Sequence, residues 1–139
     1  MDTRGLLAPT TETEVRERFE ELGPAAQVVT KEVAKAMAFD RQEYRDRVTG
    51  DVVATARDAL FSSLLRVHVG TREEFESWLD DHPDLASHVE GSDGVTRRAW
   101  HPVPVDGAVA AVTFQSEPDA AVGTLRRQAY GRHYEPLLE

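Results

Sequence analysis

The sequence predicts an α+β fold, with an N-terminal helical layer of about four helices followed by a small, mostly antiparallel sheet with two further helices. Two observations predict this order. Apolar residues up to position 64 recur at helical spacing, whereas residues 65–69 alternate between apolar and polar side chains, as in a half-buried strand. Turn signals at 91–94 and 102–107 then separate short apolar runs, which is typical of a meander of strands.

The chain begins with residues 1–10, for which we expect a flexible tail. A first helix is predicted from Thr11, because Glu14 completes a capping-box pattern three residues later. Gly23 ends this helix, and Pro24 suits the first turn of a second helix, where its missing N–H costs nothing. The inner faces are expected to carry Val15, Phe19 and Leu22 in the first helix, and Val29, Val33 and Ala36 or Met37 in the second.

Two more helices complete the helical layer. Asp40 can cap a short third helix that stops at Thr49 and Gly50, and a fourth begins at Asp51. The fourth helix leads directly into the strand predicted at 64–69, so we expect the core to be organised around this junction. Its apolar stripe consists of Val53, Ala56, Leu60 and Leu64. The residues expected to be buried together are Leu60, Leu64, Val67 and Phe114.

The second half of the chain contains the remaining strands. Thr71 and Glu74 form another capping-box pattern, which opens an acidic helix. Residues 85–90 are too short and polar for a strand to be assigned, residues 95–101 carry adjacent arginines that suit a strand near an edge, and the apolar residues 108–114 suit a central strand. The apolar face of the acidic helix carries Phe75, Trp78 and Leu79.

A final helix is predicted after the last strand. Ser116 and Asp119 indicate its cap, and Pro118 is tolerated in the first turn. Its inner face is expected to carry Ala121, Val122, Leu125 and Ala129.

The outer side of this final helix carries the candidate partner-binding residues. Arg126, Tyr130 and Tyr134 recur at i, i+4 and i+8, and Arg127 and Arg132 flank them. Arginine offers forked donors to carboxylate or phosphate and tyrosine offers a stacking face, so this surface suits a phosphate or an acidic partner. The alternative is that the arginines favour the helix dipole and pair with the acidic helix.

Bulk composition limits the class of protein. The 139 residues suit one domain, 1–139, and the absence of cysteine excludes disulfides, thiol catalysis and zinc sites of the cysteine type. We expect no membrane span, since no apolar run approaches the roughly 20 residues that a span needs. The first residues also lack the pattern of a signal peptide, which favours a cytoplasmic protein.

The net charge of −9 is unevenly distributed. Residues 61–94 hold two arginines against eight acidic residues. Of the sixteen basic residues only Lys31 and Lys35 are lysine, and the chain contains neither Ile nor Asn. Few lysines beside many acids keep a surface hydrated at molar salt, so the composition indicates a halophile with a GC-rich genome. A GC-rich mesophile with an ordinary acidic domain is the alternative.

Four stretches of the chain carry a family resemblance: GPAAQVVTKEVAKAMAFDR, VTGDVVATARDALF, VHVGTREEFESWL and AVGTLRRQAYGR. They resemble a family of small haloarchaeal proteins that is known only as a domain of unknown function. The resemblance covers nearly the whole chain. It implies a haloarchaeal setting and no catalytic residues, so function has to be argued from the residues themselves.

No constellation of residues predicts catalysis, a cofactor or a metal. None of the five histidines has a second His at ligand spacing, although His68 and His101 lie in predicted strands with Glu90 or His88 as a third candidate ligand. The chain also lacks the nucleophile elbow of hydrolases and the glycine-rich fingerprints of nucleotide-binding proteins. We therefore lean against an enzyme and expect no cofactor.

These observations favour a small interaction or regulatory module of a halophilic cytoplasm, with a protein partner or a homo-oligomer. Apolar contact is insensitive to salt screening, which makes protein association physically easier in that setting. The alternatives are a nucleic-acid-associated accessory protein and an enzyme with an unrecognised site. The net charge of −9 disfavours nucleic acid as a partner, because phosphate contacts need a basic surface.

Overall fold

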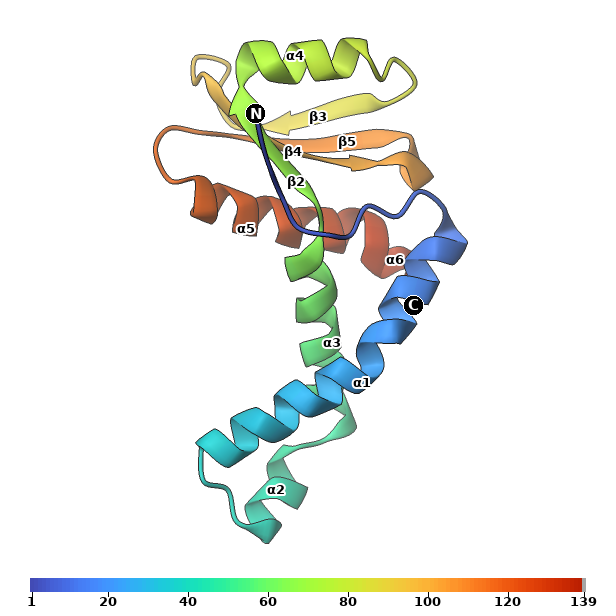
Figure 1. Ribbon diagram of the computed structural model, residues 1–139, viewed down its shortest axis with the longest axis vertical. Coiled ribbons are helices and arrows are strands. Elements are labelled where there is room, and N and C mark those ends of the chain that lie inside the picture. The colour runs from blue at the N-terminus through green and yellow to red at the C-terminus, as the bar shows by residue number, and fades with distance from the viewer. Residues whose placement is uncertain (139) are drawn as a thin grey trace.

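A computed structural model describes residues 1–138 of the chain. It consists of a sheet with helices on both faces and a group of helices that projects from it (Figure 1). We call residues 25–57, the projecting part, the stem and the remainder the head. The elements in chain order are β1 (Asp2–Arg4), α1 (Glu12–Ala36), α2 (Arg41–Arg47), α3 (Gly50–Leu64), β2 (Val67–Thr71), α4 (Arg72–Asp80), β3 (Ala86–Glu90), β4 (Arg97–Val103), a 3₁₀ turn η1 (Pro104–Asp106), β5 (Ala108–Phe114), α5 (Pro118–Ala129), a π turn η2 (Tyr130–Tyr134) and α6 (Glu135–Leu138).

The predicted α+β class is confirmed, and the sheet has five strands in the order β1-β2-β4-β5-β3. Every neighbouring pair is antiparallel except β3 and β5, which run parallel. The sheet is therefore mixed rather than a simple meander. Three helices precede β2 where about four were expected, and α4, α5 and α6 follow it.

Helices cover both faces of the sheet (Figure 1). On one face, α4 closes a small apolar cluster of Phe75, Trp100, Val109 and Ala111. On the other face, α1, α3 and α5 close a larger cluster, in which Phe61, Leu65, Leu125 and Tyr134 are fully buried. The predicted inward stripes of the first helix, the acidic helix and α5 all contribute to these clusters. Within residues 1–138, no helix is both long and apolar enough to cross a membrane.

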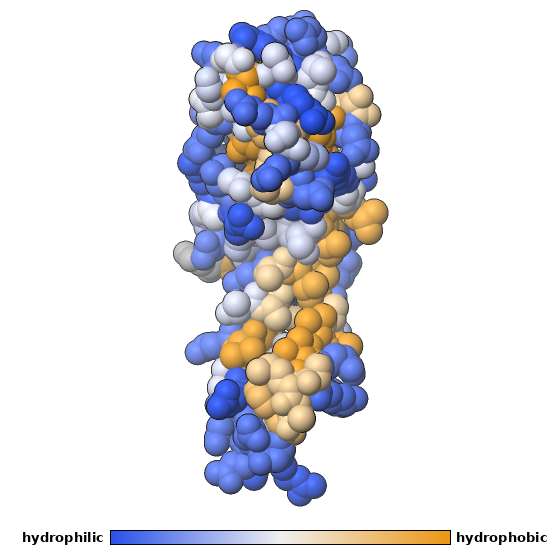
Figure 2. Space-filling model, turned by 90° about the vertical axis from the view of Figure 1, so that its left-hand side faces the viewer, coloured by the Kyte–Doolittle hydropathy of each residue, from blue (hydrophilic) through white to orange (hydrophobic). Residues whose placement is uncertain are grey.

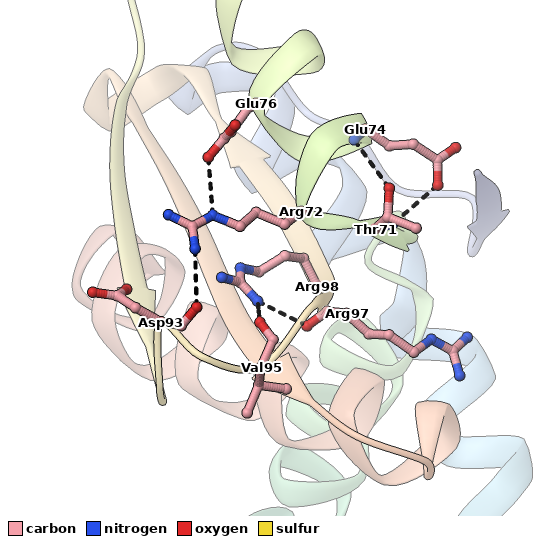
Figure 3. Close-up of polar contacts among 8 residues, drawn as sticks. All are labelled: Thr71, Arg72, Glu74, Glu76, Asp93, Val95, Arg97 and Arg98. Atoms are coloured by element: carbon pink, nitrogen blue, oxygen red, sulfur yellow. Dashed lines mark hydrogen bonds and ion pairs between the residues drawn. The ribbon is translucent and has the colours of Figure 1, made fainter.

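Local capping signals predicted most helix starts correctly. Asp40 caps α2 and Thr71 caps α4, each in a reciprocal capping box with the Glu three residues later, and Figure 3 shows the second of these. Thr11 also accepts from the backbone N–H of Glu14 at the start of α1. The predicted cap of the last helix is wrong, because α5 begins at Pro118 without a side-chain cap.

The two N-terminal helices expected on either side of Gly23 are a single helix, α1, which continues through Pro24. A proline inside a helix removes one backbone hydrogen bond, but a distant residue supports this turn. The Arg57 side chain of α3 donates to the carbonyl of Phe19 at 2.8 Å, and its guanidinium lies 4.3 Å from the centre of the Phe19 ring. Tertiary contact with α3 therefore outweighs the local break signal.

Residues 1–10, where the sequence analysis expected a flexible tail, lie along the edge of the sheet. Residues 2–4 form β1 and pair with β2. Further on, Leu7 bridges Leu65, and Pro9 is fully buried. We call residues 1–10 the N-terminal strap. The backbone N–H groups of Leu6 and Leu7 both donate to the carbonyl of Leu64, so the strap supplies hydrogen-bond donors to the C-terminal end of α3.

The strand predicted near an edge, β4, is the central strand of the sheet. Its adjacent arginines suggested exposure, yet Arg98 is only 3% exposed. Figure 3 shows how it is accommodated: the guanidinium donates to the backbone carbonyls of Val95 and Arg97. Arg97 in turn lies over the Phe114 ring. Both arginines are thus satisfied by neighbours that the pattern of charges could not reveal.

The core residues at the end of α3 are shifted by one position in the sequence from the expected ones. Val67 and Phe114 are buried as expected, but Leu60 and Leu64 are only half-buried. Phe61 and Leu65 take their place in the larger cluster. The predicted stripe was therefore one residue out of phase with the face that α3 turns towards the head.

The acid-dense segment 73–90 leads to a prediction about salt. It contains seven acidic residues and neither Lys nor Arg, and Arg72 on its border pairs with Glu76. Because screening relieves repulsion among surface charges, we expect the melting temperature to rise between about 0.1 and 2 M KCl. Asp80→Asn with Asp81→Asn should reduce this slope. A melting temperature that stays flat or falls would contradict the expectation.

Candidate functional site

Three of the five predicted partner-binding residues lie together in one cleft. Arg126, Arg127 and Tyr130 face α3 across a cleft of about 460 Å³. The sequence analysis did not identify the residues that α3 contributes, because single Asp, Ser and Thr residues on a helix carry no recognisable spacing signal. The residues lining this α3–α5 cleft are Thr55, Asp58, Ala59, Ser62, Ser63, Gly123, Arg126, Arg127 and Tyr130.

Tyr134 does not belong to an exposed surface, because its side chain is fully buried. In an uninterrupted α-helix it would share a face with Arg126 and Tyr130. The π turn η2 adds one residue at this point, so the buried stripe passes from Ala129 to Tyr134, five residues later. The expected outward row of Arg126, Tyr130 and Tyr134 is therefore broken.

The buried Tyr134 forms a hydrogen-bonded pair with His101 of β4. The Nδ1 atom of His101 lies 2.5 Å from the backbone carbonyl oxygen of Arg66, which can only accept, so Nδ1 carries the proton. Nε2 then accepts from the Tyr134 hydroxyl at 2.6 Å. Burial lowers the pKa of His101 to about 4 and raises the pKa of Tyr134. Both groups are neutral, and they join the C-terminal segment to the sheet.

Arg132 lies away from the cleft. Its guanidinium pairs with the carboxylate of Glu90 at the end of β3. The neighbouring His133 places Nδ1 2.7 Å from Asp106, in the 3₁₀ turn after β4. These contacts attach the C-terminal segment to loops of the head, so Arg132 has a structural partner where the sequence analysis placed it beside a binding surface.

The α3–α5 cleft contains two arginines that have no carboxylate partner among residues 1–138. The acidic side chain among its described lining residues, Asp58, accepts a hydrogen bond from the Tyr130 hydroxyl at 2.9 Å. Arg126 donates from Nε to the carbonyl of Leu65 at 3.0 Å, and burial, with a smaller effect of the charge on Arg4, lowers its pKa. Across the described residues, neither Arg126 nor Arg127 forms an ion pair.

The two strand histidines lie on opposite faces of the sheet. His68 is directly opposite Trp100 across the β2–β4 pair, so both point towards α4. His101 follows Trp100 in the strand and therefore points to the other face, towards Tyr134. Among residues 1–138, no group of three His, Asp or Glu side chains is arranged to hold a metal ion.

The stem is a second unusual feature, because the side chains it buries are small. The residues of α1 that are buried in the stem are Ala26, Thr30 and Ala34. Thr30 donates to the carbonyl of Ala26 at 2.7 Å, so its hydroxyl is satisfied within the helix. Such small side chains let α1 approach α3 closely, but they bury little apolar surface.

Large apolar side chains lie on the outside of the same helices. Val29, Val33 and Met37 form one row at i, i+4 and i+8, and Val33 and Met37 are 51% and 59% exposed. The sequence analysis assigned this row to the inner face of a helix, and that assignment is wrong. Figure 2 shows apolar side chains gathered in a band along the stem. The large apolar residues that the stem exposes are Val28, Val29, Val33, Met37, Tyr44 and Val52.

The stem also differs from the head in charge. Residues 25–57 contain six basic and five acidic residues, a net charge of +1, and they include both lysines of the chain. The whole chain has a net charge of −9, so the head carries the entire excess of negative charge. The exposed apolar residues thus lie on the part of the molecule that repels another copy least.

A family model described as a family of unknown function (DUF5809) matches residues 6–135. No curated protein and no solved structure matches the chain.

Proposed function

Since the chain belongs to the family of unknown function DUF5809, its function has to follow from its own surfaces, and we propose that it is an assembly module in which two copies pair through their stems. One observation carries the proposal. The row of Val29, Val33 and Met37 is exposed, although its helical periodicity is that of a buried face.

A contiguous exposed apolar patch on a soluble domain is typical of a surface that contacts a partner. Within the stem, the C-terminal part of α1 packs against the N-terminal part of α3, and the residues that α1 buries there are small. Two such pairs of helices can bury their outer rows against each other as a four-helix arrangement. A symmetric pair of patches of several hundred Å² each would bury on the order of 1,000 Å², near the lower limit for a specific interface.

Charge favours a second copy over a partner of another kind. The stem is nearly neutral, with basic and acidic residues interspersed, and α1 carries the ion pair of Lys35 with Glu32 there. A symmetric contact through this region adds little repulsion. Contact through the head would instead bring together two surfaces that each carry a large excess of negative charge. The acidic, lysine-poor composition supports a salt-rich cytoplasm as the setting, where burial of apolar surface remains effective.

The test is the mass of the protein in solution. Light scattering should give twice the 15.5 kDa of one chain for the wild type. Val33→Glu places a charge in the proposed contact and should weaken pairing by about a hundredfold or more, because an unpaired buried charge costs several kcal/mol. Gln27→Glu is the matched control: it is exposed on the same helix, changes the charge by the same amount and lies off the row.

Four outcomes would overturn the proposal. The first is a wild-type chain that remains monomeric at about 0.1 mM, a concentration at which a biologically specific pair should form. The second is a Val33→Glu protein that melts normally and still has the dimer mass, which would place the contact elsewhere. The third is equal loss of pairing in the Gln27→Glu control, since that would show an effect of charge alone. The fourth is a monomer that associates only with a different protein, since the stem would then not bind a second copy of the chain.

A further inference from the structure

We propose that the α3–α5 cleft is a binding site for a small organic oxyanion, with Arg126, Arg127 and Ser62 as the donors for its carboxylate or phosphate group. The site is separate from the stem row, and the inference does not depend on pairing of two copies. Its basis is a set of hydrogen-bond donors for which the described residues provide no anionic acceptor.

Arg126 is held in place before any ligand binds. Its Nε donates to the carbonyl of Leu65, and its terminal nitrogen Nη2 lies against the N-terminal strap at Gly5. Gly5 has a φ of +94°, and a Cβ atom at this position would lie 2.8 Å from that nitrogen. The strap and the end of α3 therefore fix the guanidinium, which lowers the entropy lost when its remaining N–H groups bind an anion.

Arg127 and Ser62 supply donors that the fold does not use. The strongest contact of Arg127 within the described part of the chain is with the Thr124 hydroxyl at 3.5 Å, the limit for a hydrogen bond. Ser62 is only 9% exposed, lines the cleft and has no hydrogen-bond partner for its hydroxyl among residues 1–138. Its hydroxyl oxygen is still accessible to solvent, so it can donate to an acceptor in the cleft.

Among residues 1–138, no carboxylate pairs with Arg126 or Arg127. The chain contains 25 acidic residues against 16 Lys and Arg, so unpaired arginines are unexpected. Arg4, whose charge acts on Arg126, does have carboxylate partners: it pairs with Asp2 at 3.0 Å and with Asp119 at 2.5 Å. Asp58 is within the cleft but accepts from Tyr130. The planar forks of Arg126 and Arg127 match the geometry of a carboxylate or a phosphate.

The rest of the lining indicates the kind of molecule that carries the oxyanion. Ala59 and Gly123 line the cleft beside the donors, as does Thr55, whose hydroxyl already donates to the carbonyl of Asp51. The volume of about 460 Å³ lies within the range of small-molecule sites. The ligand class is therefore an organic anion with a compact apolar body, which should bind more tightly than the inorganic ion alone.

The experiment is an NMR titration of the labelled protein at constant ionic strength, with inorganic phosphate, phenyl phosphate and benzoate as probes. We expect saturable shifts of the Arg Nε–H and cleft backbone signals, with phenyl phosphate or benzoate binding more tightly than phosphate. Arg127→Gln should weaken binding about tenfold or more, since it removes a charged donor without a structural partner. The preferred organic probe then distinguishes a phosphate from a carboxylate ligand.

Arg132→Gln is the matched control, because Arg132 is an exposed arginine five residues further along the same segment that pairs with Glu90 outside the cleft. It should leave binding unchanged. Ser62→Ala keeps the helix and both arginines and should weaken binding by a smaller factor. Shifts that do not saturate by about 20 mM would overturn the site, since such weak contact is ordinary charge screening. Equal effects of Arg127→Gln and Arg132→Gln would overturn it as well.

Discussion

Phe61→Ala is expected to lower the free energy of unfolding by about 3–5 kcal/mol, the range for a phenylalanine removed from a packed core. Phe61 is fully buried at the point where α1, α3 and the C-terminal segment meet. Its ring contacts those of Phe19, Tyr130 and Tyr134, with centroid distances of 5.8, 5.8 and 5.4 Å. The substitution would therefore leave a cavity lined by three aromatic rings and would also lose edge-to-face contacts.

Leu60→Ala is the matched control for this prediction. Leu60 precedes Phe61 in α3 and is only half-buried, so its truncation should cost less than half as much. Chemical denaturation of the two variants beside the wild type measures both values. Equal losses, or a larger loss for Leu60→Ala, would mean that the stripe inferred from periodicity is the true core face of α3.

Acid should destabilise the fold through His101. Its pKa is about 4 in the folded protein and near 6.5 when unfolded, because burial disfavours the charged ring more than the hydrogen bond from Nδ1 to the Arg66 carbonyl favours it. With the folded pKa depressed, the unfolded chain binds the proton first. The contribution is therefore fully present above pH 6.5 and is lost as the pH falls from 6.5 towards 4, by up to about 3 kcal/mol.

The comparison of wild type with His101→Gln isolates this effect, since both proteins share all carboxylates and His133. Gln is uncharged at every pH, so its unfolding free energy should fall less steeply between pH 6.5 and 4. Denaturant unfolding at several pH values measures both curves. Parallel curves would show that His101 is not the group whose protonation opposes folding. A variant that is weaker at pH 7 but retains the shallower slope would still support the assignment.

The sequence predicted those features that short stretches of chain determine. Capping residues fixed the starts of α2 and α4, because a side chain and a backbone N–H three residues away suffice to form the cap. The alternation of side chains at 65–69 located β2, and the turn signals at 91–94 and 102–107 located β4 and β5. The break expected at Gly23 failed for the opposite reason: the turn is supported by Arg57, which lies more than thirty residues further along the chain.

The candidate sites were only partly predictable. The row of Val29, Val33 and Met37 was recognised as an apolar stripe, but periodicity does not reveal whether a partner helix of the same chain covers it. In the final segment, one additional residue in the π turn moved Tyr134 from the outside to the core. Arg126 and Arg127 were identified from the spacing along their own helix. Asp58 and Ser62 could be assigned to the cleft only from the packing of α3 against α5.

The single parallel pair in the sheet constrains the order in which the chain can fold. β4 and β5 are joined by the 3₁₀ turn and Gly107, so they can close as a local hairpin. β3 precedes β4 in the chain but pairs only with β5, on the far side of that hairpin. It therefore joins the sheet through β5 alone, and most of its side chains are exposed. We expect β3 to pair after the β4–β5 hairpin has formed, because its contact with β5 closes a longer loop than the hairpin does.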